Sequence, residues 1–86
     1  MPVYKITISK TAQKQLDKLP DNIADKLIVA IYKLADNPRP PGYKKLKGRD
    51  GYRVREGDYR IIYKVFDDIL LIDVVALGHR KDIYEL

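Results

Sequence analysis

The chain has 86 residues with 17 Lys or Arg and 12 Asp or Glu, so that its formal net charge is +5. Residues 1–86 are expected to form a single domain, without room for a second. The absence of cysteine excludes a disulfide framework and a zinc–thiolate site, and a single histidine excludes a multi-histidine metal cluster. No N-terminal segment is typical of a signal peptide and no apolar run is long enough to cross a bilayer, which leads us to expect a cytoplasmic protein.

The positive charge is concentrated in the middle of the chain. The segment from Arg39 to Arg60 holds eight basic and three acidic residues, so that its net charge of +5 equals that of the whole chain. Such a segment suits an anionic partner, either nucleic acid or an acidic protein. The alternative is that the charge only keeps a small protein soluble.

The N-terminal part predicts one strand and two helices. Apolar and polar side chains alternate over residues 3–8, as in a half-buried strand. Ser9 is a suitable N-cap for a short helix over residues 10–18. Apolar residues recur at helical spacing over residues 22–36, and residues 19–22 break the first helix and cap the second. An αα-hairpin is therefore expected.

The second half predicts a loop followed by three strands. Residues 37–51 hold three prolines and three glycines among basic residues, which is typical of a loop. The strands are expected over about residues 52–56, 59–66 and 69–77, with hairpin turns between them and Gly78 ending the last. The predicted fold class is α+β: an N-terminal strand, a two-helix hairpin and a three-stranded antiparallel meander that completes a four-stranded sheet.

The predicted hairpin carries three arginines. Arg53 and Arg55 share one face of its first strand, and Arg60 lies on its second strand. Whether Arg60 joins their face depends on the register, which stays open at this point. Arginine is charged at any biological pH and matches phosphate oxygens with a planar fork. If the three converge, they would stabilise a phosphate or the extra charge of a pentavalent phosphorane. The alternative is an ordinary solvated face of a sheet.

The C-terminal segment and the loop add further candidates. His79 is the only histidine, the residue type best suited to proton transfer near neutral pH, although it could equally be a strand-end residue bonded to the backbone. Arg80 extends the basic set. Tyr84 could stack on a nucleobase or pack the chain end onto the sheet. The candidates for contact with RNA or the ribosome are Lys44, Lys45, Lys47 and Arg49.

Over almost its whole length, the sequence resembles the RelE/ParE superfamily of bacterial toxins, specifically the RelE-like branch. The segments DYRIIY (residues 58–63) and GHRKDIY (residues 78–84) are the most specific, whereas YKITISKTAQKQLDKLP is shared with the branch directed against DNA gyrase. The resemblance implies a ribosome-dependent mRNA endoribonuclease, an mRNA interferase. In that reaction a ribose 2′-hydroxyl attacks the adjacent phosphate in the ribosomal A site, and neither a metal nor a cofactor is needed.

The resemblance also implies partners and residue roles. The partners are the ribosome with its mRNA and an acidic, partly disordered RelB-like antitoxin that covers the basic site in a hetero-oligomer. By position, Arg60 is similar to the phosphate-binding arginine of the family. Arg80 is similar to the arginine that supports the leaving 5′-oxygen, and Tyr84 to the tyrosine that stacks on or orients the substrate.

One departure from the family leaves the general base open. Arg53 and Arg55 stand where the best-studied branch has two lysines, and arginine is too basic to serve as a base. His79 and Tyr84 are then the candidates for proton transfer. Alternatively, no residue acts as a strong base, and charge stabilisation with positioning by the ribosome carries the reaction.

Two other functions are open as alternatives: a ParE-like inhibitor of DNA gyrase, and a toxin homologue that binds RNA or the ribosome without cleaving. The arginines together with His79, Arg80 and Tyr84 argue against the first alternative, because an inhibitor that only binds gyrase needs no ribonuclease site.

Overall fold

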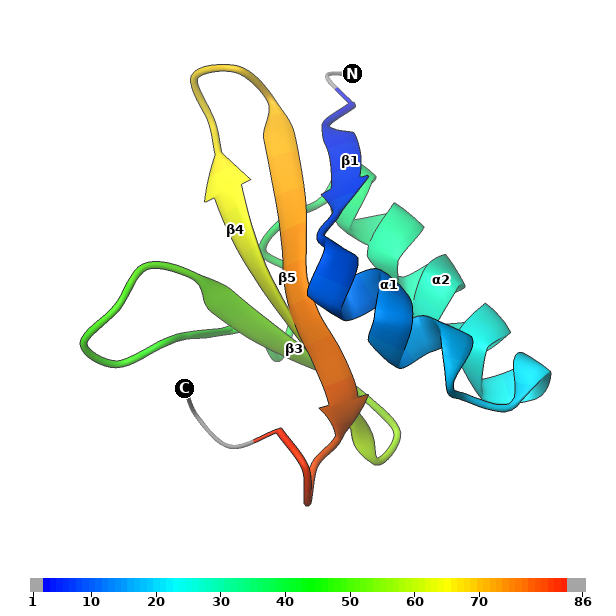
Figure 1. The fold of residues 1–86 in the computed structure, drawn as a ribbon. Helices are drawn as coiled ribbons and strands as arrows, with labels where there is room; N and C mark the ends of the chain where they lie inside the picture. The colour runs from blue at the N-terminus through cyan, green and yellow to red at the C-terminus, as the bar shows by residue number, and fades with distance from the viewer. Residues whose placement is uncertain (1–2, 84–86) are drawn as a thin grey trace.

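The computed structural model describes residues 3–83, which form two helices and a five-stranded sheet (Figure 1). Both helices lie on one side of the sheet, so that the predicted α+β class is confirmed. The elements in chain order are β1 (Lys5–Ile8), α1 (Lys10–Asp17), α2 (Asp21–Asp36), β2 (Lys44–Lys45), β3 (Tyr52–Glu56), β4 (Tyr59–Phe66) and β5 (Leu71–His79).

The strands are arranged in the order β1-β5-β4-β3-β2. β1 runs parallel to β5, and the other neighbours are antiparallel, as the predicted meander requires. The sheet has five strands and not the predicted four. The additional strand is β2, which lies inside the segment predicted as a loop. Its two residues, Lys44 and Lys45, pair with Arg53 and Tyr52 of β3. Two residues are too few to show any periodicity, which is why the sequence did not predict this strand.

The predicted ends of the helices hold to within one residue. The Ser9 side chain caps α1 as expected, because its Oγ accepts the Ala12 N–H at 3.1 Å. Pro20 caps α2 through its backbone oxygen, which accepts the N–H groups of Ile23 and Ala24 at 3.0 and 2.9 Å. As far as the described residues go, neither helix is long and apolar enough to cross a membrane.

β5 lies two residues further along the chain than predicted, at both of its ends. The loop between β4 and β5 has four residues, 67–70, so that β5 begins only at Leu71. Gly78 does not end the strand, because it pairs with Arg60 and the strand continues to His79. Apolar side chains cover β5 on both faces, those of the helices on one and those of Leu46 and Ile83 on the other, which explains why its sequence is apolar on nearly both faces.

A β-bulge in β5 decides which of its side chains face the helices. Ile62 of β4 pairs with Ala76, and the next residue, Tyr63, pairs with Val74, so that Val75 is the extra residue. The extra residue reverses the alternation of side chains along the strand. Even-numbered residues of β5 therefore face the helices before the bulge and the opposite side after it.

The helices and the sheet enclose the main core. Tyr63 of β4 lies at its centre, fully buried between the sheet and α2. The largest side chains in this core are all less than 2% exposed: Tyr63, Leu27, Ile31, Leu34, Ile61, Ile72, Leu77 and Val74. Burial of this apolar surface is the main force that holds the sheet and the helices together.

A second, smaller cluster lies on the opposite side of the sheet. We call it the small cluster, and it consists of Leu46, Ile62, Ala76 and Ile83. Leu46 belongs to the loop after β2 and Ile83 to the chain after β5, so that both segments are held against the sheet by apolar contacts. Figure 1 shows the segment after β5, in red, turning back toward β3.

The loop between α2 and β2 is anchored by a polar network around Asp67. The Arg39 guanidinium donates to both carboxylate oxygens of Asp67, at 2.9 and 3.3 Å, and the Tyr4 hydroxyl donates to Oδ1 at 2.7 Å. Arg39 also lies over the ring of Tyr52, 5.2 Å from its centroid. The hydrogen bonds from Arg39 and Tyr4 hold the pKa of Asp67 below its usual range, and the bond to Asp67 raises the pKa of Tyr4.

A buried hydrogen bond fixes the same loop from beneath. The Tyr63 hydroxyl donates to the backbone oxygen of Pro38 at 2.6 Å. Burial raises the pKa of Tyr63 to about 12, so that the hydroxyl keeps its proton at any biological pH. These contacts position the loop that leads into β2 at the edge of the sheet.

Candidate active site

The register of the β3–β4 hairpin brings the three predicted arginines onto one face. Arg55 lies directly opposite Arg60, and Arg53 lies opposite Ile62. Directly opposite residues of an antiparallel pair point to the same side. The register follows from the two-residue turn Gly57–Asp58, which joins the opposed pair Glu56 and Tyr59. That turn was the sequence signal that could have fixed the face of Arg60 in advance.

Two rows of side chains cross this face, which we call the arginine face. It is the side of the sheet that the helices leave open, because the side chains that pack against the helices come from the alternate positions. The first row is Lys44, Arg53, Ile62 and Ala76, one residue from each of β2, β3, β4 and β5. The second row is Arg55, Arg60 and Gly78. Cations therefore occupy the β2 and β3 side of the face, and small or apolar residues occupy the β5 side.

A cavity of about 370 Å³ lies over the cationic half of the arginine face. It is lined by Gly42, Lys44, Arg53, Arg55 and Arg60, and we call it the arginine pocket. Its charged lining residues are all basic. A pocket of this composition is suited to a multiply charged anion, and the planar guanidinium groups match the oxygens of a phosphate.

The electrostatics of the pocket are unfavourable without an anion. Like charges directly opposite each other destabilise an antiparallel pair, and Arg55 and Arg60 are such a pair. The Arg60 side chain is half-buried, and its Nε is a buried donor for which residues 3–83 supply no hydrogen-bond acceptor. A buried donor of this kind carries a desolvation cost until an acceptor reaches it. An anion bound in the pocket would offset the repulsion between the opposed charges.

Arg80 lies at the end of the sheet where Arg60 lies. Its backbone N–H donates to the Asp58 oxygen at 2.8 Å, which extends the β4–β5 ladder by one residue past the Tyr59–His79 pair. The Arg80 side chain is 3.9 Å from the Asp58 carboxylate, and both are more than half exposed. Such an exposed and long contact contributes little, so that the guanidinium can turn toward a ligand.

The structure does not bring His79 together with the arginines. Neighbouring residues of a strand point to opposite sides, and Gly78 is the one that lies on the arginine face. The His79 ring packs edge-on against Tyr59, with the ring centroids 5.4 Å apart, on the side of the helices. Its Nδ1 accepts the N–H of Lys81 at 3.1 Å. Tyr84 lies outside the described residues.

The four candidates for contact with RNA or the ribosome separate into different environments. Lys44 lines the arginine pocket, whereas Lys45 pairs with Tyr52 and alternates to the other side. Lys47 and Arg49 are exposed in the loop before β3. These last two residues extend the basic surface without entering the pocket.

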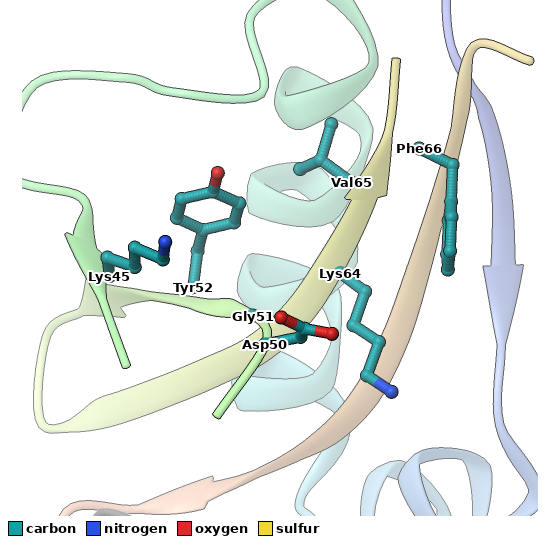
Figure 2. A pocket seen from close by; sticks show the side chains of 7 residues that line it. All are labelled: Lys45, Asp50, Gly51, Tyr52, Lys64, Val65 and Phe66. Carbon is teal, nitrogen blue, oxygen red and sulfur yellow. The ribbon is translucent and has the colours of Figure 1, made fainter. Parts of the chain in front are cut away.

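A second hollow nearby has mixed chemistry (Figure 2). It has a volume of about 330 Å³ and is lined by Lys45, Asp50, Gly51, Tyr52, Lys64, Val65 and Phe66. Figure 2 shows Tyr52 and Val65 directed to one side of the strands, and Lys64 and Phe66 to the other, with the Asp50 carboxylate turned toward Lys64. The charged side chains of this hollow are two lysines and one aspartate, so that it is not uniformly basic as the arginine pocket is. Among residues 3–83, no three His, Asp or Glu side chains are placed to hold a metal ion.

Known proteins with similar sequences identify the family of the chain. The family model described as the ParE toxin of the type II toxin–antitoxin system parDE matches residues 6–84. A putative RelE-like toxin protein of Escherichia coli is 33% identical over 87 residues, which cover 96% of this chain and 92% of that protein. The chain belongs to the RelE/ParE superfamily of toxins.

Two further comparisons are with a relative named for its activity and with a solved structure. A protein of E. coli K12 named mRNA interferase toxin RelE is 27% identical over 81 residues, covering 91% of this chain and 84% of that one. In the crystal structure of the toxin–antitoxin complex RelBE2 from Mycobacterium tuberculosis, a chain superposes with a TM-score of 0.85 at 25% identity, over 93% of this chain and 94% of that chain. This RelE/ParE toxin therefore has the fold of the RelE structures.

Proposed function

We propose that this toxin is a ribosome-dependent mRNA interferase that cleaves mRNA in the A site. The observation that carries the proposal is the arginine pocket, in which the opposed pair Arg55 and Arg60 and the neighbouring Arg53 line one cavity. The name of the E. coli K12 relative, an mRNA interferase toxin, supports the same activity.

In the proposed reaction, one P–O bond forms and another breaks. The ribose 2′-oxygen attacks the adjacent phosphorus and loses its proton, while the 5′-oxygen of the next nucleotide leaves and gains one. The pentavalent intermediate carries one more negative charge than the phosphodiester, so that cations stabilise it more than the substrate. We propose that Arg60 holds a non-bridging oxygen and that Arg53 and Arg55 supply further charge, which is supported by their place in the lining of one pocket.

The side chains that line the pocket include no carboxylate or histidine for proton transfer, and Lys44 is the one charged group among them that can exchange a proton. All of its charged lining side chains are Lys or Arg, and the arginines stay protonated. Arg80 is proposed to stabilise the charge that develops on the leaving 5′-oxygen, from its position beside Asp58. Tyr84 remains a predicted substrate contact. In this mechanism positioning on the ribosome and charge stabilisation supply most of the rate enhancement.

We further propose that the partner of the toxin in the cell is an acidic antitoxin. The crystal structure with the TM-score of 0.85 is that of a toxin–antitoxin complex. The net charge of +5 favours association with an acidic chain, and complementary charge raises the association rate most strongly at low salt. An acidic segment over the arginine pocket would occupy the place of the phosphate.

Primer extension on a defined mRNA tests the proposed activity. Ribosomes are stalled with a known codon in the A site, and the purified toxin is added to one sample while another receives toxin and mRNA without ribosomes. We expect cuts confined to the A-site codon and none without ribosomes. An intact message in both samples would refute the proposal.

The description of the family model supports one second candidate, inhibition of DNA gyrase, because it names the ParE toxin. A supercoiling assay with purified gyrase separates the two activities. Loss of supercoiling with intact mRNA would assign the arginine pocket to protein docking instead of phosphate chemistry.

A further inference from the structure

We infer that His79 and Ile83 are positioning residues. Together they fold the chain after β5 back onto the arginine face and hold Arg80 at the end of the sheet where Arg60 lies, and His79 carries no proton in the reaction. The fold-back itself rests on the structure alone. Its effect on cleavage rests on the proposed function.

His79 makes the turn by accepting three backbone N–H groups. Its ring Nδ1 accepts the Lys81 N–H at 3.1 Å. Its backbone oxygen accepts the N–H groups of Asp82 and Ile83 at 2.8 and 3.0 Å. These bonds reverse the direction of the chain within a few residues of the end of β5, as the red segment in Figure 1 shows. The side-chain bond is the part of the turn that depends on residue 79.

Ile83 anchors the other end of the turn. It is only 6% exposed, although the segment around it is polar, and it packs against Leu46, Ile62 and Ala76 in the small cluster. It also lies over Gly78: a Cβ atom at Gly78 would be 3.0 Å from the Ile83 Cγ1 and 3.3 Å from its Cδ1. The missing side chain at position 78 is thus what allows Ile83 to reach the sheet.

Arg80 lies between the bend at His79 and the anchor at Ile83. Its backbone is fixed by the 2.8 Å bond to Asp58, whereas its side chain is held only by the exposed 3.9 Å contact. The place of its guanidinium relative to Arg60 is therefore set mainly by the path of the backbone. A change that releases the turn would move Arg80 without altering the side chains that line the arginine pocket.

The same geometry argues against His79 as a proton carrier. Its Nδ1 accepts a hydrogen bond, which requires that this nitrogen carry no proton. A protonated ring would place an N–H group against the Lys81 N–H and would lose the bond. The neutral ring then carries its proton on Nε2 and has no free lone pair to act as a base, and a general acid must be protonated before it acts, so that both roles and the turn exclude each other. The ring also packs on Tyr59, on the side of the sheet away from the arginine pocket.

His79→Asn and His79→Ala separate the two roles. Asparagine can accept the N–H two residues ahead, as it does in Asx turns, but it cannot transfer a proton near neutral pH. We expect His79→Asn to keep nearly full kcat and an unchanged pH–rate profile. We expect His79→Ala to lose about 10²-fold in kcat with little change in KM, because Arg80 is displaced from the leaving oxygen. Equal losses of about 10²-fold or more in both variants would identify His79 as a proton carrier and overturn the inference.

Hydrogen exchange of backbone amides, measured by NMR, reports the turn without reference to activity. We expect the amides of Lys81 and Ile83 to be protected in the wild type and in His79→Asn, and to exchange faster in His79→Ala and in Ile83→Ala. Ile69→Ala is the matched control, because Ile69 is 64% exposed and lies on the β4–β5 loop. Unchanged protection in His79→Ala and Ile83→Ala would overturn the fold-back itself.

Gly78→Ala tests the anchor in a second way, because its methyl group must displace Ile83 or the strand. We expect faster exchange at Ile83 and a lower kcat, as in Ile83→Ala, while the unfolding midpoint stays well above the assay temperature. A Gly78→Ala protein with full kcat would contradict the positioning role. If the wild type does not cleave mRNA, the proposed function fails and the positioning role with it, whereas the exchange data still decide whether the fold-back exists.

Discussion

The side chains on the helix-covered face of the sheet are packed in the main core, whereas the arginine face has cations on one side and small or apolar residues on the other. β4 serves both faces at once, with Ile61 and Tyr63 directed toward the helices and Arg60 and Ile62 away from them. The difference teaches that stability and ligand chemistry are separated by the alternation of a single strand. Substitutions at Ile61 or Tyr63 should therefore affect folding, and substitutions at Arg60 mainly activity.

The arginine face has a stability problem that the small cluster addresses. Opposed arginines contribute repulsion to the β3–β4 pair. Leu46 and Ile83 cover the adjacent Ile62 and thereby tie the loop and the chain end to the sheet. The apolar contacts beside the pocket thus hold two segments next to its cationic side chains.

The largest expected effect is on activity, from Arg60→Ala. Removing one preorganised cation from a charged transition state costs about 10²–10³-fold in kcat. The unfolding midpoint should stay unchanged or rise slightly, because the repulsion with Arg55 disappears. Ribosomal cleavage rates and thermal melts measure the two quantities. Lys33→Ala on α2 removes the same charge far from the pocket in sequence and should leave cleavage intact. An Arg60→Ala protein that cleaves normally would rule out the proposed phosphate site.

Ile61→Ala and Ile62→Ala compare how much packing on each face of the sheet contributes to the free energy of unfolding. Both side chains are buried, at 0% and 2% exposure, and they are neighbours on β4. We expect Ile61→Ala to lose about 3–5 kcal/mol of unfolding free energy and Ile62→Ala about 2–3, because the thin cover of the small cluster can collapse more easily around the vacated space. Urea denaturation measures both. An equal or larger loss for Ile62→Ala would show that the arginine face contributes as much packing energy as the main core.

Tyr63→Phe tests the link between the main core and the loop that leads to the arginine pocket. The substitution leaves the buried oxygen of Pro38 without its 2.6 Å donor, which should cost about 1–3 kcal/mol. The wild type should also lose stability between about pH 10 and pH 12, where the hydroxyl would ionise first in the unfolded chain, since the folded-state pKa is about 12. In Tyr63→Phe, this part of the loss of stability at alkaline pH should be absent. If Tyr63→Phe left the free energy of unfolding unchanged, the loop would be held by other contacts.

Local patterns in the sequence predicted most of the fold, and the family resemblance supplied the residue roles. Alternation over residues 59–66 correctly divided β4 into two faces, and Ser9 correctly marked the start of α1. The bulge at Val75 and the continuation of β5 through Gly78 could not be predicted, because both depend on the pairing partner. Glycine normally weakens a strand, and here its small size serves the distant Ile83.

The placement of the candidate residues shows the same limit. The faces of Arg53 and Arg55 followed from alternation, whereas the position of His79 depends on the bulge upstream in β5, which reverses the sides of all later residues. A histidine next to the predicted site residue Arg80 in the sequence is thereby directed to the side of the sheet opposite the arginine face. Proximity along the chain is a weak guide to a site wherever a bulge intervenes.

The smallest expected effect concerns the polar network that borders both faces. The pKa of Asp67 is lowered chiefly by the Arg39 hydrogen bonds and then by Tyr4, so that the folded state favours the carboxylate. A lowered pKa contributes stability above the unfolded-state value, 3.8, and this contribution is lost as the pH falls through the folded-state value. We therefore expect the wild type to lose its advantage over Asp67→Asn in urea denaturation as the pH falls from about 5 to about 2. The difference should be small at any pH, because the Arg39 and Asp67 side chains are 36% and 55% exposed. A difference that does not shrink toward low pH would show that Asp67 acts through its shape and hydrogen bonds and not through its charge.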